Sequence, residues 1–497
     1  MSFTTVAFFV FLLAGIVVYY VLPKNVQWIW LLILSYIYYF TFSIKASLFM
    51  VFATVTIYFG GIWLQNIQNT GDRYLKDNKE TLSREDKKAY KESLRRKKRW
   101  VLFLILLLDF GMLAVVKYSN FAIENINSVL GLMGKEPIGL LGMGLPLGIS
   151  FFTFQSVSYA IDVYQGKYEC EKNIFKMGLF VSFFPQLLQG PIGRYDRLGK
   201  QLYSGHSFNL KNVEYGLQRI GWGLFKKVVI ADRAAVLVLN VFNNYEAYSG
   251  FHYIMAVLMY SVDLYMDFSG GIDIVIGAAQ MFGITMDENF RQPYFSKSIG
   301  EFWRRWHISL STWFREYVYI PLGGNRKGDS RTITNLLIVW MLTGFWHGAA
   351  WNFVAWGLYY GIILILEKFV WGQYVEKWPG AVRHIYAMVL ILIGWVLFFS
   401  PSLGYALKYV GVMFGIRASG LMDKLGWFYL LSNWLIYLMA VLGSSSIGYR
   451  LMRNIQRAPG SRVGKYIMTG VMYLVMFALS LAFLVTQSFN PFLYFRF

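Results

Sequence analysis

Apolar segments recur along almost the whole of this 497-residue chain, and most are long enough to cross a lipid bilayer. A transmembrane helix needs about 20 predominantly apolar residues. Hydrophobic residues make up 56% of the chain and charged residues only 15%. A typical soluble domain carries about 25% charged residues. We therefore predict an all-α polytopic membrane protein.

Counted as single spans, the apolar blocks predict eleven to twelve transmembrane helices in one membrane domain, residues 1–497. The first block has no basic residue before it and no small-residue cleavage site after it, so we expect a retained helix and not a signal peptide. The blocks lie at residues 6–22, 26–42, 46–63, 101–116, 145–163, 175–188, 213–242, 254–282, 336–366, 387–399, 427–442 and 466–485.

Basic residues are in clear excess, with 47 Lys and Arg against 27 Asp and Glu, a net charge of +20. Because membrane proteins retain basic loops on the cytoplasmic side, this excess favours a topological role over nucleic-acid binding. Residues 66–100 hold twelve basic and six acidic residues and end in RRKKR, directly before an apolar block. We predict a solvated, partly helical cytoplasmic loop, which places the N-terminus outside after three crossings.

Two segments do not have the pattern of simple spans. Residues 183–191 (FFPQLLQGP) contain two prolines and a glycine, so a helix must break or end there. Broken backbone at membrane depth persists only where it is buried in protein or lines a wet cavity, and Gln186 of this segment is a candidate substrate contact. Residues 289–327 are too polar to span and too aromatic for a free loop, so we expect helices that lie in or re-enter the membrane.

One of only five histidines, His347, lies in the stretch TGFWHGAAW. Its apolar block would measure about 45 Å as one helix, more than the ~30 Å hydrocarbon core, so the block must tilt, bend or form two pieces. Gly344 and Gly348 are the natural bending points. A helix start near Asn335 would put His347 about 18 Å along the axis, near mid-membrane. Such an imidazole is either a functional group or a neutral packing group hydrogen-bonded to a carbonyl.

A second histidine, His307, lies in the aromatic stretch at residues 301–328. We predict one interfacial helix here that ends before Pro321 and is followed by a tight turn at residues 323–325. His307 would point toward the apolar stripe of this helix. Arg304 and Arg305 could reach lipid headgroups or bind an anionic group such as a phosphate. The stripe is formed at helical spacing by Trp303, Trp306, Leu310 and Trp313.

Three aspartates, Asp263, Asp267 and Asp273, lie in an otherwise apolar span. Asp263 and Asp267 share a helix face, and buried carboxylates need partners such as Arg or His across the bundle. For these aspartates, a structural role in holding helices together is slightly favoured over a catalytic role. The single cysteine, Cys170, excludes an internal disulfide or a thiolate metal cluster. Its two acidic neighbours should raise its pKa, so we expect a structural residue.

These residues leave three chemistries open. The two histidines could ligate haem or another metal. They could form a proton path in a transporter. One of them could be a general base that deprotonates a hydroxyl for attack on an acyl donor. Serine-elbow, HExxH and phosphate-loop motifs are absent from the sequence.

Several motifs resemble the membrane-bound O-acyltransferase (MBOAT) superfamily, and in particular its alginate O-acetylation branch. The densest resemblance covers about residues 145–356. D-alanyl transfer proteins of teichoic acid synthesis share the RWH and WHG motifs, but PLGGNRKG and the FRF ending fit the polysaccharide-acetylation branch better. The matching stretches are FFPQLLQGPIGRY, MYSVDLYMDFSGGIDI, EFWRRWHISLSTWFREYVYIPLGGNRKG, GFWHGAAWNFVAWG and the terminal PFLYFRF.

The resemblance implies a bundle of about 11 transmembrane helices, with re-entrant or interfacial helices, around a central funnel. It places the active-site histidine at His347 and the second family histidine at His307, which favours a general base over haem or transport. It further implies a multi-pass protein of the bacterial cell membrane without bound metal or cofactor. Acetyl-CoA or another thioester would be the donor substrate, and the partners would be an extracytoplasmic SGNH-type acetyltransferase or a polysaccharide acceptor. The candidate substrate-binding residues are Trp303, Arg304, Arg305, Trp306, Asn325, Trp346, Asp267 and Gln186.

Overall fold

The computed structural model describes residues 1–142, 144–243, 250–416, 420, 424–447, 450, 454 and 461–486. Within these ranges the regular structure is helical and no strand is present, which confirms the predicted all-α class. The chain forms two compact units, mainly Thr5–Asn212 with Ala279–Met286 and Val213–Ala278 with Asp287–Phe497. The terminal motif PFLYFRF lies outside the described residues.

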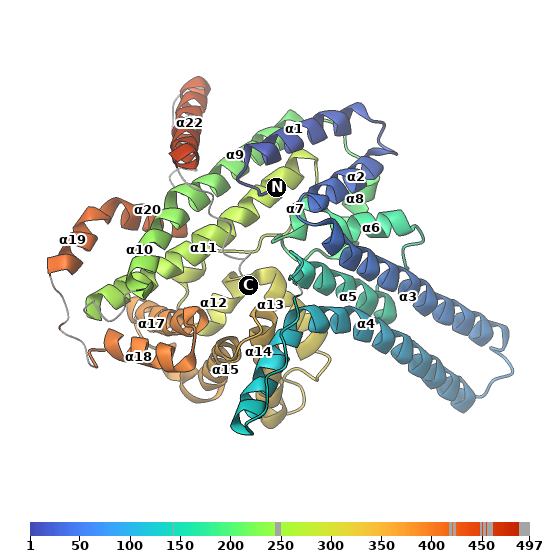
Figure 1. The fold of residues 1–497 in the computed structure, drawn as a ribbon. Coiled ribbons are helices and arrows are strands. Elements are labelled where there is room, and N and C mark those ends of the chain that lie inside the picture. Colours follow the sequence, from blue (N-terminus) through green and yellow to red (C-terminus); the bar gives the residue numbers. More distant parts are fainter. Residues whose placement is uncertain are drawn as a thin grey trace. The chain divides into compact units, whose positions relative to one another are not determined.

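The first unit begins with two apolar helices and a long helical hairpin (Figure 1). The helices after α5 are short, and a π-helical turn, η1, leads directly into the last of them, α8. In chain order these elements are α1 (Val6–Val21), α2 (Gln27–Phe40), α3 (Ile44–Asp77), α4 (Arg84–Leu132), α5 (Ile149–Gln165), α6 (Ile174–Ser182), α7 (Phe184–Leu187), η1 (Tyr195–Gly199) and α8 (Lys200–Ser204).

Helices α3 and α4 pack side by side as an antiparallel hairpin. A Cβ at Gly60 would lie 2.4 Å from the side chain of Ile105, and one at Gly71 would lie 2.3 Å from that of Leu94, so side chains of α4 pack directly on these glycines of α3. The 49 residues of α4 measure about 73 Å, far more than the hydrocarbon core. The solvated, partly helical segment predicted at 66–100 is present, but most of it is helix: it consists of the polar ends of α3 and α4, joined by a short turn.

The turn of this hairpin is fixed by its own sequence. Ser83 caps α4, because its hydroxyl accepts from the backbone N–H of Asp86 at 3.0 Å, while the Asp86 carboxylate accepts from the N–H of Ser83 at 3.3 Å. Such reciprocal capping satisfies two donors that a helix start otherwise leaves open. Farther along, Lys98 donates to Gln68 at 2.8 Å across the hairpin. The basic segment is thus an ordered helical extension.

The break expected at residues 183–191 is present. Helix α6 ends at Ser182, Phe183 leaves the helical region, and α7 has only four residues. Gly190 must be glycine, because a Cβ there would lie 2.5 Å from the backbone of Gln186. The whole segment is buried within the first unit, as irregular backbone in a membrane protein must be.

The second unit contains both candidate histidines. Short helices and π-helical turns interrupt its longer helices. The elements are α9 (Leu210–Leu224), η2 (Phe225–Ala231), α10 (Asp232–Asn243), α11 (Gly250–Met281), η4 (Pro293–Phe295), α12 (Ile299–Arg305), α13 (Ile308–Phe314), η5 (Arg315–Tyr319), α14 (Asp329–His347), α15 (Trp351–Leu366), η6 (Glu367–Trp371), α16 (Gly372–Val375), α17 (Gly380–Phe399), α18 (Leu403–Met413), α19 (Lys424–Ser432), α20 (Trp434–Ser444) and α22 (Arg462–Thr486).

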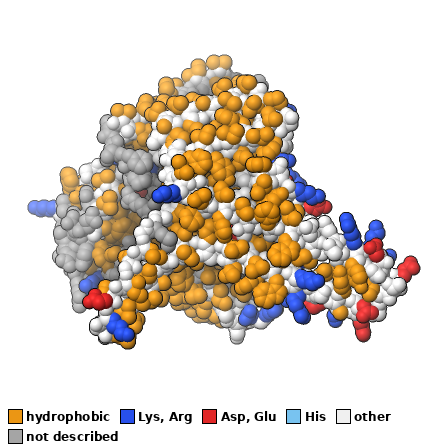
Figure 2. Space-filling model, turned by 45° about the vertical axis from the view of Figure 1, so that its right-hand side comes forward, with side chains coloured by type: hydrophobic (Ala, Val, Ile, Leu, Met, Phe, Trp, Pro, Cys, Tyr) orange, Lys and Arg blue, Asp and Glu red, His pale blue; other side chains and the backbone are white. Residues whose placement is uncertain are grey.

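Within the described ranges, five helical segments are long and apolar enough to cross a membrane, and a sixth is possible if the bent pair α19–α20 is one span. Helices α1 and α2 are apolar but shorter, and α11 carries three aspartates, so the count of about eleven spans stays a prediction. Many large apolar side chains of these helices are exposed, as expected for surfaces that face lipid. Figure 2 shows hydrophobic side chains over most of the face that it draws. The segments are Ile44–Asp77, Arg84–Leu132, Trp351–Val375, Gly380–Phe399 and Val463–Val485.

Candidate functional site

His307 lies at a break between two short helices. Helix α12 ends at Arg305, and α13 begins at Ile308. His307 itself has φ 45°, one of two positive-φ residues other than glycine among the described residues. The continuous interfacial helix predicted through this stretch is therefore wrong. A strained backbone of this kind persists only where its surroundings impose it.

Asn289 imposes this backbone conformation. Its carbonyl accepts from the N–H of Ile308 at 3.0 Å, and its side-chain oxygen accepts from the N–H of Ser309 at 2.9 Å. The same oxygen lies 3.4 Å from Nδ1 of His307. One asparagine, 18 residues upstream, thus caps α13 and orients the imidazole, which is 1% exposed. Apart from its polarity, Asn289 has no sequence feature that indicates this role.

His347 is the last residue of α14, where the chain reverses direction. Gly348 is extended, and α15 begins at Trp351 and packs back along α14 (Figure 1). The apolar block around His347 was expected to tilt, bend or form two pieces. It forms two pieces, with the break at Gly348. The helix starts at Asp329, earlier than predicted, so His347 lies about 27 Å along its axis instead of about 18 Å. The membrane depth of the imidazole stays a prediction.

Glycines allow the α14–α15 hairpin to close. A Cβ at Gly344 would lie 2.4 Å from the carbonyl oxygen of Phe353, and one at Gly357 would lie 2.3 Å from that of Trp340. A Cβ at Gly348 would meet the Phe353 ring at 2.1 Å. Small residues at such crossings let membrane helices approach closely. These contacts fix the end of α14 that carries His347.

The ring of Trp346 contacts the rings of both histidines. Its ring centroid is 5.8 Å from that of His307 and 4.9 Å from that of His347, edge-to-face in both cases. Two further rings pack against His347: Trp356 at 4.8 Å and Phe398 at 5.4 Å. His347 is 8% exposed. Two imidazoles from separate elements therefore lie against one group of aromatic rings, Trp346, Trp356 and Phe398, which we call the aromatic wall.

Trp303 and Trp306 extend this wall from α12. The ring of Trp303 is 5.6 Å from that of Trp356, and the ring of Trp306 is 5.0 Å from that of Trp395. Both tryptophans are buried. Both contribute to the predicted aromatic stripe, although α12 ends at Arg305, between the two tryptophans. The wall connects to His347 through Trp356.

The two arginines of α12 differ in their surroundings. Arg305 forms an ion pair with Glu301 at 2.6 Å, one helical turn away. Arg304 is exposed. Asn325 is also exposed, in the predicted turn, where Gly323 and Gly324 have positive φ. A substrate role for these three polar residues stays a prediction.

Asp267 lies in a buried network of charges. Its carboxylate pairs with Lys227, which also lies 3.0 Å from Asp232, and all three side chains are buried. Asp273 pairs with Lys226 at 2.6 Å and with Arg219 at 2.8 Å. The predicted need for partners is confirmed, but most partners are lysines from η2 instead of histidine. This arrangement supports the structural role that the sequence slightly favoured.

Gln186 belongs to the first unit. Its amide donates to the side-chain oxygen of Gln155, whose own amide donates to the carbonyl of Phe180 at 2.5 Å. The hydrogen bonds therefore tie the broken segment to α5 and α6. Cys170, in the same unit, is buried, and burial raises the pKa of its thiol with smaller contributions from Glu169 and Glu171. Both acids act as predicted, but burial is the larger cause.

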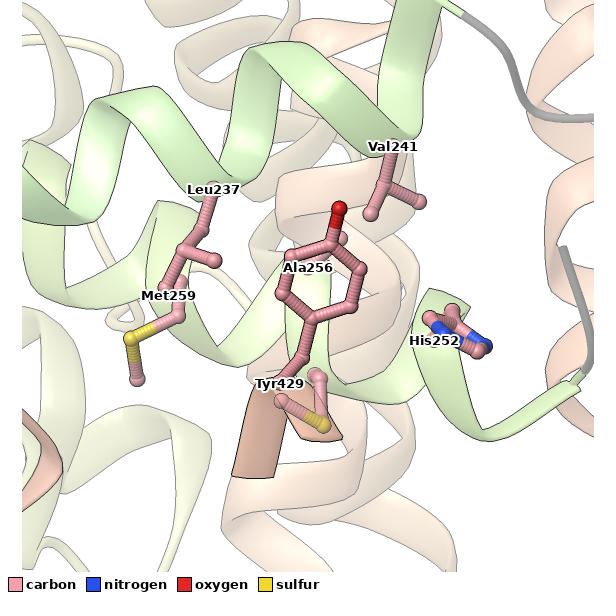
Figure 3. A pocket seen from close by; sticks show the side chains of 7 residues that line it. Leu237, Val241, His252, Ala256, Met259 and Tyr429 are labelled. Atoms are coloured by element: carbon pink, nitrogen blue, oxygen red, sulfur yellow. The ribbon is translucent and has the colours of Figure 1, made fainter. Parts of the chain in front are cut away.

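An apolar pocket lies elsewhere in the second unit. It encloses about 290 Å³, including the open space at its mouth. Figure 3 shows Tyr429 at its centre and His252 at one side. His307 and His347 are not among its lining residues, so this pocket is separate from the paired-imidazole site. The lining residues are Leu237, Val241, His252, Met255, Ala256, Met259 and Tyr429.

The helices and the site together define a polytopic all-α membrane protein with two buried imidazoles on one aromatic wall. Residues 51–407 match the family described as "MBOAT, membrane-bound O-acyltransferase family". The chain therefore belongs to the membrane-bound O-acyltransferase family, and it is an O-acyltransferase.

The chain is similar over most of its length to curated bacterial proteins. A probable alginate O-acetylase of Azotobacter vinelandii is 33% identical and covers 99% of both chains. One from Pseudomonas putida is 36% identical over 80% of this chain and 84% of the relative. A peptidoglycan O-acetyltransferase of Helicobacter pylori is 32% identical over 84% of this chain and 80% of the relative.

Proposed function

We propose that this protein transfers an acetyl group from a cytoplasmic thioester, acetyl-CoA, toward the hydroxyl groups of an exported polysaccharide. The similar proteins named above are O-acetylases of alginate and of peptidoglycan, which are both glycans. The observation that carries the proposal is the placement of His347 at the tip of the α14–α15 hairpin, joined to His307 through Trp346.

In the proposed reaction His347 is the general base. It takes the proton of the acceptor hydroxyl, and the oxygen attacks the thioester carbonyl carbon. The carbon–sulfur bond then breaks, and the leaving thiolate receives the proton from His347, so that the products are an ester and a thiol. A positioned base of this kind contributes about 10²–10⁴-fold to the rate. His307 orients the donor or polarises its carbonyl.

The aromatic wall supports this chemistry by excluding water. Trp303, Trp346 and Trp356 are large and buried, and polar contacts are stronger where water is excluded. Arg304 is exposed and could contact the phosphates of the donor. Basic loops on the cytoplasmic side would attract the negatively charged donor from solution.

We place the protein in the bacterial cell membrane with its N-terminus outside. The donor would enter from the cytoplasm through a central funnel, and the acceptor would approach from the other face. The acceptor would be the polysaccharide itself or an SGNH-type acetyltransferase outside the membrane that passes the acetyl group on. D-alanyl transfer to teichoic acid is the alternative, and transport without acyl turnover is a more remote one.

The test compares the ester content of the exported polysaccharide in cells that express wild type, His347→Ala and His307→Ala. At matched protein abundance in the membrane, His347→Ala should abolish acetylation and His307→Ala should reduce it strongly. Undiminished ester content in His347→Ala would remove the assignment. Incorporation of labelled D-alanine in place of acetate would favour the alternative.

A further inference from the structure

The N-terminus of α12 has its first three backbone N–H groups all capped by side chains. Ser298, the residue before the helix, accepts from the N–H of Glu301 at 3.0 Å. The two preceding N–H groups, of Ile299 and Gly300, donate to the two carboxylate oxygens of Glu367 at 2.7 and 2.9 Å. These groups have no partner within their own helix, so the caps complete its hydrogen bonding.

Glu367 lies just after the end of α15 that is far from His347. It is the first residue of η6 and directly follows α15, the helix that begins beside His347. Tyr386, on α17, donates to the same carboxylate at 3.2 Å, and the indole of Trp371 donates to Tyr386 at 2.9 Å. The carboxylate is therefore itself held in place by α17.

Two connections thus join α12 to α15. At one end, Trp303 of α12 packs on Trp356 of α15, which contacts His347. At the other end, Glu367 binds the start of α12. Helix α12 has only seven residues and leads directly to the break that carries His307. A short helix fixed at both ends cannot shift along α15 without breaking one of the connections.

We infer that Glu367 is a positioning residue that sets the distance and orientation between His307 and His347. The inference rests on the proposed function, in which both imidazoles act on one reacting centre. A carboxylate suits the position, because two oxygens accept two N–H bonds and a negative charge is favourable at a helix N-terminus. Glutamine offers only one accepting oxygen, so it cannot replace the pair.

The kinetic test uses Glu367→Gln protein in membrane vesicles, with radiolabelled acetyl-CoA as donor and ester formation as readout. We expect kcat to fall about tenfold to a hundredfold, because small misplacement of reacting groups costs about that much, while KM for acetyl-CoA stays close to wild type. Ser298→Ala removes a cap of the same helix that does not reach α15, so it should leave kcat nearly unchanged. Glu376→Gln changes an exposed glutamate nearby and should have no effect.

A second readout is independent of the reaction. Hydrogen exchange of the peptide that contains Ile299 and Gly300 should be faster in Glu367→Gln than in wild type, while peptides of α14 exchange as before. Full kcat in Glu367→Gln, an equal loss in Ser298→Ala, or loss of folded protein in place of a kcat effect would each overturn the inference. If His347→Ala remained active, the proposed function would fail, whereas the exchange result would still report on the Glu367 contact.

Discussion

The ring centroid of Trp346, on α14, lies 5.8 Å from that of His307, which occupies the break between α12 and α13. Trp346 also contacts His347. Its side chain therefore packs against both imidazoles. We predict that Trp346→Ala lowers the acetyl transfer rate by about a hundredfold, while Trp346→Phe, which keeps a ring, loses less. Equal rates in wild type and Trp346→Ala, measured at matched protein levels in vesicles, would contradict this role.

The pair formed by Asp267 and Lys227 should contribute to folding and not to substrate binding. Both side chains are almost completely buried. Asp267→Ala removes one of the two carboxylates that neutralise the buried Lys227 ammonium, and Asp232 remains, so the free energy of unfolding should fall by about 3 kcal/mol or less. Exchanging Lys227, Asp232 and Asp267 together for apolar side chains should cost much less. Thermal unfolding of the detergent-solubilised variants measures this difference, and a raised KM at unchanged stability would instead indicate a substrate contact.

Gly348 should tolerate no side chain. A Cβ at this position would lie 2.1 Å from the Phe353 ring, so Gly348→Ala forces the α14–α15 hairpin apart at a cost of about 1–3 kcal/mol. Gly470 in α22 is the matched control, because its added Cβ would meet no atom within 4 Å. We expect Gly470→Ala to keep wild-type activity and yield. An active, fully stable Gly348→Ala protein would show that the hairpin closes differently.

Cys170 should react slowly with alkylating reagents. Burial raises the pKa of its thiol, so the reactive thiolate is scarcer at pH 8 than for an exposed cysteine. We predict much slower labelling of the native protein than of protein unfolded in detergent, and normal activity for Cys170→Ala. Rapid labelling of the native protein, or inactivation by the substitution, would contradict a structural role.

Local sequence patterns predicted those parts of the fold that local chemistry determines. The prolines at 185 and 191 indicated the broken segment, and glycines around His347 indicated the division of its apolar block. The segment at 66–100 has more helix than the predicted partly helical loop, because polar residues can extend a helix beyond the membrane as well as end it. Its Ser83 cap, which starts α4, was the local signal that was missed.

The parts that could not be predicted depend on residues far apart in the sequence. The break at His307 requires Asn289, and the start of α12 requires Glu367, 67 residues away from Gly300. Helical spacing alone favoured a continuous helix, because neither partner is visible in the stretch itself. The pairing of Asp267 with Lys227 is of the same kind: burial predicted a partner, but only the fold selects the residue.

The most direct measurement follows labelled acetate across the membrane. Inside-out vesicles that contain the polysaccharide acceptor and any outer partner are given radiolabelled acetyl-CoA on the exposed cytoplasmic face. The account predicts that wild type esterifies the enclosed polysaccharide, while His347→Gln, present at equal abundance, does not. Equal labelling of the polysaccharide by the His347→Gln vesicles would contradict the central claim.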